Sequence, residues 1–160
     1  PVGTILVPLV MYFSTQGLFM FGWAKPVPVD FARLNNPKRD IRYVAFAGPA
    51  ANLLMALFWA ASLKLQLTAG LQEPFFIEMA KAGIGVNMVL AALNLLPILP
   101  LDGGRILFSY LPAKLADGFS KTERYGMVIL IVLVVANVLP VFIRPLVALG
   151  VEVLAILFNL

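Results

Sequence analysis

Two residue types that bind metals in proteins are missing from this 160-residue chain, which contains no histidine and no cysteine. The lack of cysteine excludes a disulfide framework and a thiolate zinc site. Charged residues are also scarce, at 12%, against roughly 25% in soluble domains. Hydrophobic residues make up 61% of the chain, and the mean hydropathy is +0.95. This composition predicts an integral membrane protein.

Four long stretches contain no Asp, Glu, Lys or Arg, namely residues 1–24, 43–63, 82–101 and 125–143. Each is close to the ~20 residues that cross a bilayer core as a helix. Glycine and proline interrupt the first stretch, so it could re-enter the membrane instead of spanning it. Residues 141–160 form an apolar tail that suits a final short helix. We therefore expect an all-α polytopic membrane protein with about three to five membrane-embedded helices.

The polar segments predict an orientation and a division of the chain. Residues 25–42 carry five Lys or Arg and residues 105–124 carry four, whereas residues 64–81 carry two. The excess of basic residues places the first two segments on the cytoplasmic side. The net charge of +4 comes from basic residues between the apolar runs, as membrane orientation predicts. We therefore expect the bilayer, and no nucleic acid, as a partner.

Four parts follow from this pattern. Residues 1–24 are a membrane-embedded segment, and residues 25–42 are an extended, basic segment on the cytoplasmic side. Prolines at alternate positions predict a small extended, β-like element near residues 23–31. Residues 43–115 form a core of helices, and residues 116–160 form C-terminal membrane helices.

The most informative residue is Asp102, which ends an uncharged apolar run and is followed by Gly103, Gly104 and Arg105. A carboxylate in this setting is costly unless it is bound or reacts. It could pair with Arg105 at the membrane interface. It could instead ligate a metal such as zinc, with the two glycines letting the backbone pass close to the centre. The glycines could equally form a tight turn after the prolines that end the preceding helix.

Asn52 and Asn94 are polar residues inside apolar helices, where an amide without a hydrogen bond is costly. They could join helices to one another, a contribution of roughly 0.6–2 kcal/mol. They could instead present their amides to a substrate backbone or to an oxyanion. Gly48, Ala51 and Asn52 share one helix face, which favours close contact between helices.

Three motifs in order carry a resemblance: Ala-Gly-Pro-Ala-Ala-Asn at residues 47–52, Asn-Leu-Leu-Pro at 94–97 and Leu-Asp-Gly-Gly at 101–104. Together they resemble the site-2 protease family, the intramembrane zinc metalloproteases of peptidase family M50. Residues 22–29 and the basic segment after them are similar to the bacterial branch that lacks a PDZ domain. The resemblance covers roughly residues 1–115.

The resemblance implies a role for each matching residue. Asp102 would ligate the catalytic zinc, and Asn94, with Asn52, would orient substrate or stabilise the tetrahedral intermediate. The extended element would pair with a strand of the substrate, an unwound transmembrane segment of another protein. The remaining motif residues would shape the core, namely Gly48, Pro49, Pro97, Gly103 and Gly104. The expected location is a bacterial inner membrane.

One departure from the family is large. The other two zinc ligands and the general base of the family come from a His-Glu-x-x-His helix, and this sequence has no histidine. A catalytic zinc takes three protein ligands and a water, so we expect the chain as it stands to be inactive. The intact remainder of the signature favours a chain that lacks an upstream helix over a degenerate relative. The alternative class is a non-catalytic membrane scaffold or transporter-like subunit, in which Asp102 pairs with Arg105.

Overall fold

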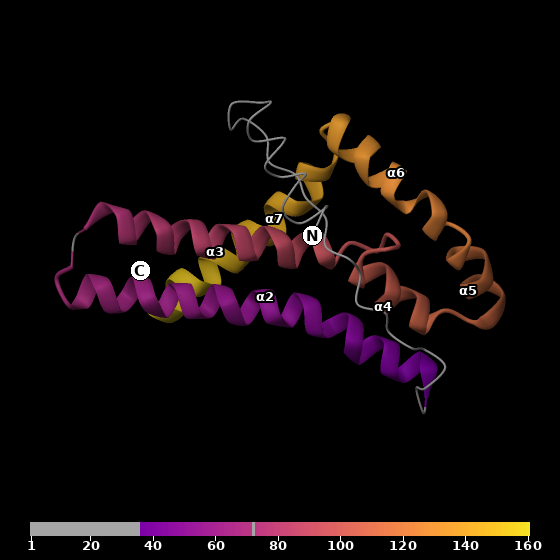
Figure 1. Ribbon diagram of the computed structural model, residues 1–160, viewed down its shortest axis with the longest axis horizontal. Helices are drawn as coiled ribbons and strands as arrows, with labels where there is room; N and C mark the ends of the chain where they lie inside the picture. The colour runs from indigo at the N-terminus through magenta and orange to yellow at the C-terminus, as the bar shows by residue number, and fades with distance from the viewer. Residues whose placement is uncertain (1–35, 72) are drawn as a thin grey trace, which may run out of the picture. The chain divides into compact units, whose positions relative to one another are not determined.

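The computed structural model describes residues 36–71 and 73–160, and this part of the chain is all-helical (Figure 1). The predicted membrane-embedded segment 1–24 and the predicted extended element near residues 23–31 lie outside the described residues. The helices are α2 (Pro37–Thr68), α3 (Pro74–Asn94), α4 (Asp102–Tyr110), α5 (Ala113–Ser120), α6 (Glu123–Val135) and α7 (Leu139–Phe158).

Three of the described helices are long and apolar enough to cross a membrane. They are Arg39–Thr68 within α2, the whole of α3 and the whole of α7. The predicted all-α polytopic membrane fold is therefore confirmed for the described residues.

The predicted helix boundaries are wrong in the last third of the chain. The sequence predicts a span over residues 125–143 and a short helix after it, but α6 has only 13 residues and α7 has 20. The helical conformation is interrupted between them, where Asn137 adopts the left-handed conformation with φ 56°. Pro140 then lies in the first turn of α7, where proline favours a helix start. Apolarity alone does not mark such a break.

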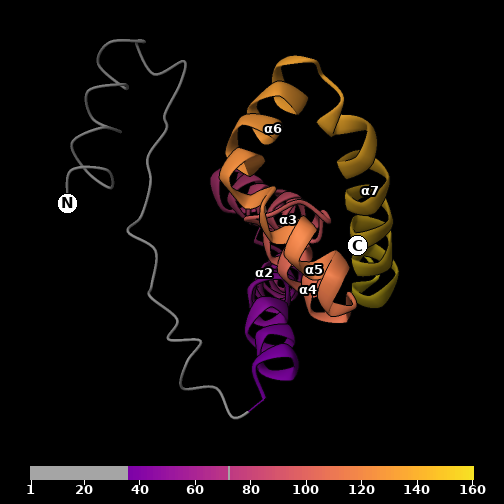
Figure 2. The same ribbon diagram turned by 90° about the vertical axis from the view of Figure 1, so that its right-hand side faces the viewer.

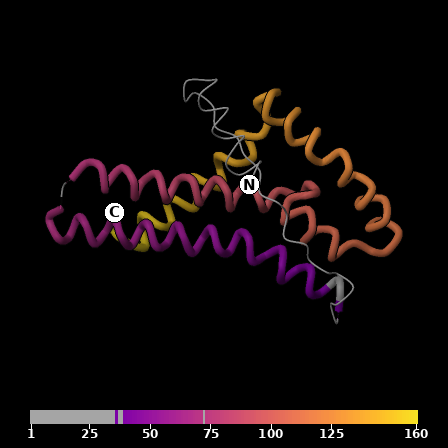
Figure 3. Tube along the Cα trace, viewed as in Figure 1, coloured from indigo at the N-terminus to yellow at the C-terminus, as the bar shows by residue number. Residues whose placement is uncertain are grey.

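Helix α2 begins earlier than predicted, so residues 37–42 belong to the helix and not to the extended segment before it. Asn36 is the N-cap residue and Pro37 the first helical residue. The backbone N–H of Asn36 donates to the Asp40 carboxylate at 3.0 Å. The helix continues through the buried Pro49 and curves along its length (Figure 3), as an interior proline favours.

Helices α2 and α3 lie side by side and antiparallel, joined by a short connection, and α7 packs across them (Figures 1 and 2). Small residues let the helices approach closely. Gly83 of α3 faces the Trp59 ring of α2, and Gly150 of α7 faces the Met88 sulfur of α3. The main buried cluster contains Ala56, Ala60, Leu63, Ala80, Ile84, Met88 and Leu154. This packing fixes α2, the helix against which α4 is placed.

Candidate metal site

A compact loop leads from α3 into α4 and sets the position of Asp102. The Ile98 N–H donates to the Leu96 carbonyl at 2.8 Å, and the Leu101 N–H donates to the Ile98 carbonyl at 2.9 Å. The Arg105 N–H then donates to the Leu101 carbonyl at 3.1 Å, which closes the first turn of α4. Asp102 is thus the first residue of α4, where the helix dipole favours a negative charge.

The structure brings Asp102 against Gly48, so two separate motifs meet at one place. A Cβ atom at Gly48 would lie 3.2 Å from the Asp102 carboxyl carbon and would overlap the Oδ2 atom. Only glycine leaves room for the carboxylate here. Gly48 therefore makes room for the Asp102 carboxylate, besides any role in close helix contact.

Gly103 and Gly104 lie in α4 and are buried, and neither adopts a positive φ. They do not form the tight turn that the sequence allowed. A Cβ at Gly104 would lie 2.5 Å from the Ile98 carbonyl carbon, and one at Gly103 would overlap the carbonyls of Leu95 and Leu96. Their missing side chains let α4 press against the loop that leads into it.

Burial and charge act on the Asp102 carboxyl in opposite directions. Partial burial raises its pKa above the ordinary value, and the charge of Arg105 acts to lower it. The Arg105 guanidinium also donates to the Glu123 carboxylate of α6 at 3.2 Å. Arg105 thus bonds directly to Glu123 and acts on Asp102 through its charge.

The asparagines lie on the helices that flank this place. Asn52 is on α2, one turn after Gly48, and Asn94 is the last residue of α3, and both are half-buried. Neither amide forms a hydrogen bond within residues 36–71 and 73–160, so in this part of the chain they do not join helices. By contrast, Asn87 donates to the Gly83 carbonyl of its own helix at 2.8 Å.

The described residues do not form a zinc centre by themselves. Among them, no group of three or more His, Cys, Asp or Glu could hold a metal ion, whereas a catalytic zinc takes three protein ligands. What they offer is one carboxylate, at a helix start, in a space kept open by Gly48. The site therefore fits one ligand of a zinc centre and not the whole centre.

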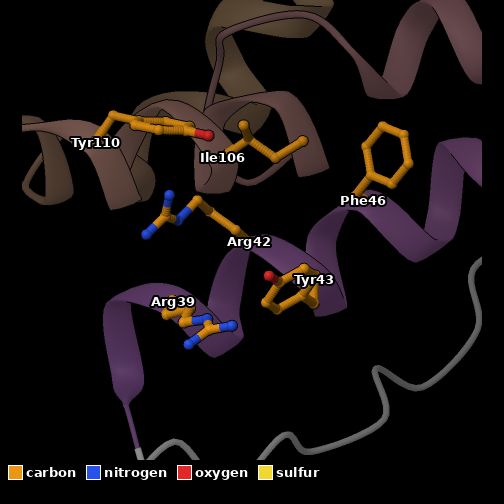
Figure 4. A pocket seen from close by; sticks show the side chains of 6 residues that line it. All are labelled: Arg39, Arg42, Tyr43, Phe46, Ile106 and Tyr110. Atoms are coloured by element: carbon orange, nitrogen blue, oxygen red, sulfur yellow. The ribbon is translucent and has the colours of Figure 1, made fainter.

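A second cluster was missed from the sequence. Six residues of α2 and α4 line a cavity of about 280 Å³, namely Arg39, Arg42, Tyr43, Phe46, Ile106 and Tyr110 (Figure 4). Their spacing on α2 follows one helix face. That spacing is recognisable only when residues 37–42 belong to the helix, whereas the sequence pattern predicts an extended segment there.

Comparisons with known proteins point to the same family as the motifs. The family model described as Peptidase family M50 matches residues 68–139. The chain is 32% identical over 144 residues to "Putative zinc metalloprotease YwhC" of Bacillus subtilis (strain 168), covering 84% of this chain and 60% of that protein. It is 40% identical over 103 residues to "Putative zinc metalloprotease Rip3" of Mycobacterium tuberculosis (strain H37Rv), covering 61% of this chain and 25% of that protein.

These matches support the assignment of the chain to peptidase family M50, the family of the site-2 proteases. The family and the named relatives support a metalloprotease, and with the apolar helices they support an integral membrane protein. The chain spans 60% of the length of the Bacillus relative and 25% of the mycobacterial one. No solved structure matches the chain.

Proposed function

We propose that this chain forms part of an intramembrane zinc metalloprotease of the site-2 type, in which Asp102 is one of the zinc ligands. The observation that carries the proposal is the contact between Gly48 and Asp102. Two motifs that are far apart in the sequence meet there, and glycine is the residue that leaves space beside the carboxylate. The remaining ligands and the general base would come from residues outside these 160, since this sequence contains no histidine.

Within the proposed enzyme, the residues of this chain would hold the zinc ligand Asp102 in place and orient the substrate. The first turn of α4 fixes Asp102, and the buried glycines of α4 fix that helix against its loop. Asn52 and Asn94 have amides free of hydrogen bonds within the described residues, which suits contact with an unwound substrate backbone. Zinc, when bound, would supply a Lewis acid that polarises the scissile carbonyl.

The proposed substrate is a transmembrane segment of another protein, cleaved in a bacterial inner membrane. The described residues include three helices able to cross a membrane, and one of them, α2, packs against the helix that carries Asp102, which supports a membrane-embedded substrate. Both relatives carry the name "Putative zinc metalloprotease", which supports zinc as the cofactor.

The alternative is a non-catalytic membrane scaffold or transporter-like subunit. The observation that favours it is the Asp102 carboxylate, which lies within the electrostatic influence of Arg105 and belongs to no group of three or more His, Cys, Asp or Glu among the described residues. In that protein the charge of Arg105 would stabilise Asp102 without a metal.

Substitution of Asp102→Asn in the full-length protein tests the proposal. We expect loss of bound zinc and a fall in cleavage of a membrane substrate by about two orders of magnitude or more, because losing even an outer-shell partner costs about 10–100-fold. The measurements are zinc content by mass spectrometry and a cleavage assay on reconstituted protein. Asp117→Asn is the matched control, since Asp117 is exposed and paired with Lys121 at 2.8 Å.

Zinc content that stays unchanged in the Asp102→Asn protein would refute the ligand role. A full-length protein that binds no zinc at all, before any substitution, would favour the scaffold alternative.

A further inference from the structure

The cavity between α2 and α4 combines positive charge with aromatic rings. Among the described residues that line it, two are arginines, two are tyrosines, and none is acidic. The Arg42 guanidinium lies over the Tyr110 ring at 4.6 Å from its centre, and Arg39 lies over the Tyr43 ring at 5.8 Å. Both distances are within the range of cation–π contacts, which hold the guanidinium groups in place on the cavity wall.

The two helices supply different edges of this cavity (Figure 4). Arg42 lies between α2 and α4, Arg39 lies nearer the start of α2, and Phe46 and Ile106 form an apolar edge. A ligand that fills about 280 Å³ here would meet cationic groups at one end and hydrocarbon at the other. An anionic group with an attached apolar part matches this lining.

The position of the cavity along α2 points to the membrane surface. The segment of α2 that can cross a membrane begins at Arg39, so Arg39, Arg42 and Tyr43 lie at the level where a helix leaves the hydrocarbon core. Phosphate groups of lipids lie at this level, and tyrosine is enriched there. Residues 25–42 also form the most basic segment of the chain, which the anionic cytoplasmic leaflet would face.

From these observations we propose that the cavity lined by Arg39, Arg42 and Tyr110 binds the phosphate group of an anionic phospholipid. The guanidinium groups bind the phosphate oxygens, which they match with paired N–H donors. Phe46 and Ile106 contact the start of the acyl chains. Because the cavity walls belong to both α2 and α4, the bound lipid joins the two helices.

Because the bound lipid contacts both α2 and α4, it also affects the geometry of the candidate metal site. Ile106 and Tyr110 lie one and two turns after Asp102 on α4, and Gly48 lies on the same helix as Arg42. A lipid that holds α4 against α2 therefore also holds Asp102 beside Gly48. The lipid site itself does not depend on the proposed protease activity, so its failure would leave that proposal standing.

Native mass spectrometry of the full-length protein, taken from nanodiscs of phosphatidylglycerol or phosphatidylcholine, tests this proposal. We expect the protein to retain phosphatidylglycerol and not phosphatidylcholine. The double substitution Arg39→Gln with Arg42→Gln should weaken retention of phosphatidylglycerol roughly 30-fold, and Arg39→Gln alone roughly fivefold. The single change affects an exposed side chain at a helix start, which keeps the test valid if the double variant does not fold.

Arg124→Gln is the matched control. Arg124 lies over the Tyr125 ring at 4.7 Å but does not line the cavity, so this change removes the same charge and the same kind of ring contact elsewhere. Equal loss of lipid in the Arg39→Gln and Arg124→Gln proteins would overturn the proposal, because it would show general attraction to charge.

A second measurement separates the lipid from a soluble phosphate. Phosphatidylglycerol should raise the midpoint of thermal unfolding of the unsubstituted protein and not that of the double variant, since a ligand stabilises the state that binds it. Inorganic phosphate at millimolar concentration should not reproduce the shift. A shift produced equally by inorganic phosphate, or displacement of the lipid by it, would overturn the lipid assignment.

Discussion

At the residue scale, the site depends as much on a missing side chain as on a charged one. Gly48 has no Cβ, and the Asp102 carboxylate occupies the space that a Cβ would need. A carboxylate that packs so close to a helix backbone is held in one place. The position of Asp102 is therefore specified by Gly48 as well as by the first turn of its own helix.

Substitution of Gly48→Ala should displace Asp102 and destabilise the protein by about 1–3 kcal/mol, the usual cost of forcing a methyl group into a packed site. The thermal unfolding midpoint in detergent measures this. Gly85→Ala in α3 is the control, because a Cβ there meets nothing within 4 Å and alanine favours a helix by up to about 1 kcal/mol.

Combining Gly48→Ala with Asp102→Ala should recover part of the lost stability, since the second change removes the group that the new methyl meets. Additive losses in the double variant would show that the two residues do not contact one another.

The residue patterns in the sequence anticipated part of this site. The spacing of the motifs selected Gly48 and Asp102, and both lie at the contact between α2 and α4. The sequence did not show that Gly103 and Gly104 are helical, because a glycine pair after two prolines is equally typical of a turn. Which role applies depends on the loop that packs against them, and that contact is set by the tertiary structure.

At the element scale, the loop from α3 to α4 is held between glycines of two helices. Gly103 and Gly104 of α4 contact its backbone on one side, and a Cβ at Gly126 of α6 would overlap the Leu99 carbonyl oxygen. The ion pair between Arg105 and Glu123 also joins α4 to α6. Helix α6 thus helps to fix the loop that places Asp102.

Substitution of Gly126→Ala should move α6 away from this loop, because the atom that obstructs the new methyl belongs to the backbone and cannot rotate away. We expect faster hydrogen exchange at the amides of α4 and α6, with α2 and α3 unchanged. Gly118→Ala in α5 serves as the control, since its Cβ would meet nothing within 4 Å. Protection that is unchanged in α4 would mean that α6 does not support the site.

The helix boundaries show where prediction from sequence fails at this scale. The apolar run across residues 125–143 contains no charge, yet the chain turns at Asn137 within it. Hydropathy reports which residues avoid water and does not report the backbone conformation of a single asparagine. In the same way, residues 25–42 were predicted to be an extended segment, whereas Asn36 and Pro37 are the cap and first residue of a long helix.

At the scale of the whole molecule, the described helices define two ends. The connection between α2 and α3 lies at one end, together with the end of α7, where the Lys64 ammonium donates to the Asn159 carbonyl at 2.9 Å. The start of α2 and the loop into α4 lie at the other end (Figure 1). The basic segments predict that this second end is cytoplasmic.

The lack of cysteine makes this orientation testable with single labels. We expect Leu71→Cys, in the connection between α2 and α3, to react with a membrane-impermeant maleimide in intact cells. Lys114→Cys, in α5, should react only after the cells are opened. Any cysteine elsewhere in the full-length protein is first replaced. Labelling of Lys114→Cys in intact cells would reverse the predicted orientation.

The proline inside α2 restricts what can surround the helix at that level. Pro49 has no N–H, so the carbonyl oxygen of Ala45 lacks the donor that an unbroken helix would supply four residues later. In hydrocarbon such an oxygen is costly, and it is tolerated only where protein or water covers it. Ala45 is only 2% exposed, and it lies one turn before Gly48. Protein therefore covers this oxygen, and the side of α2 that carries it, near the Gly48 that Asp102 packs against, is turned away from the lipid tails.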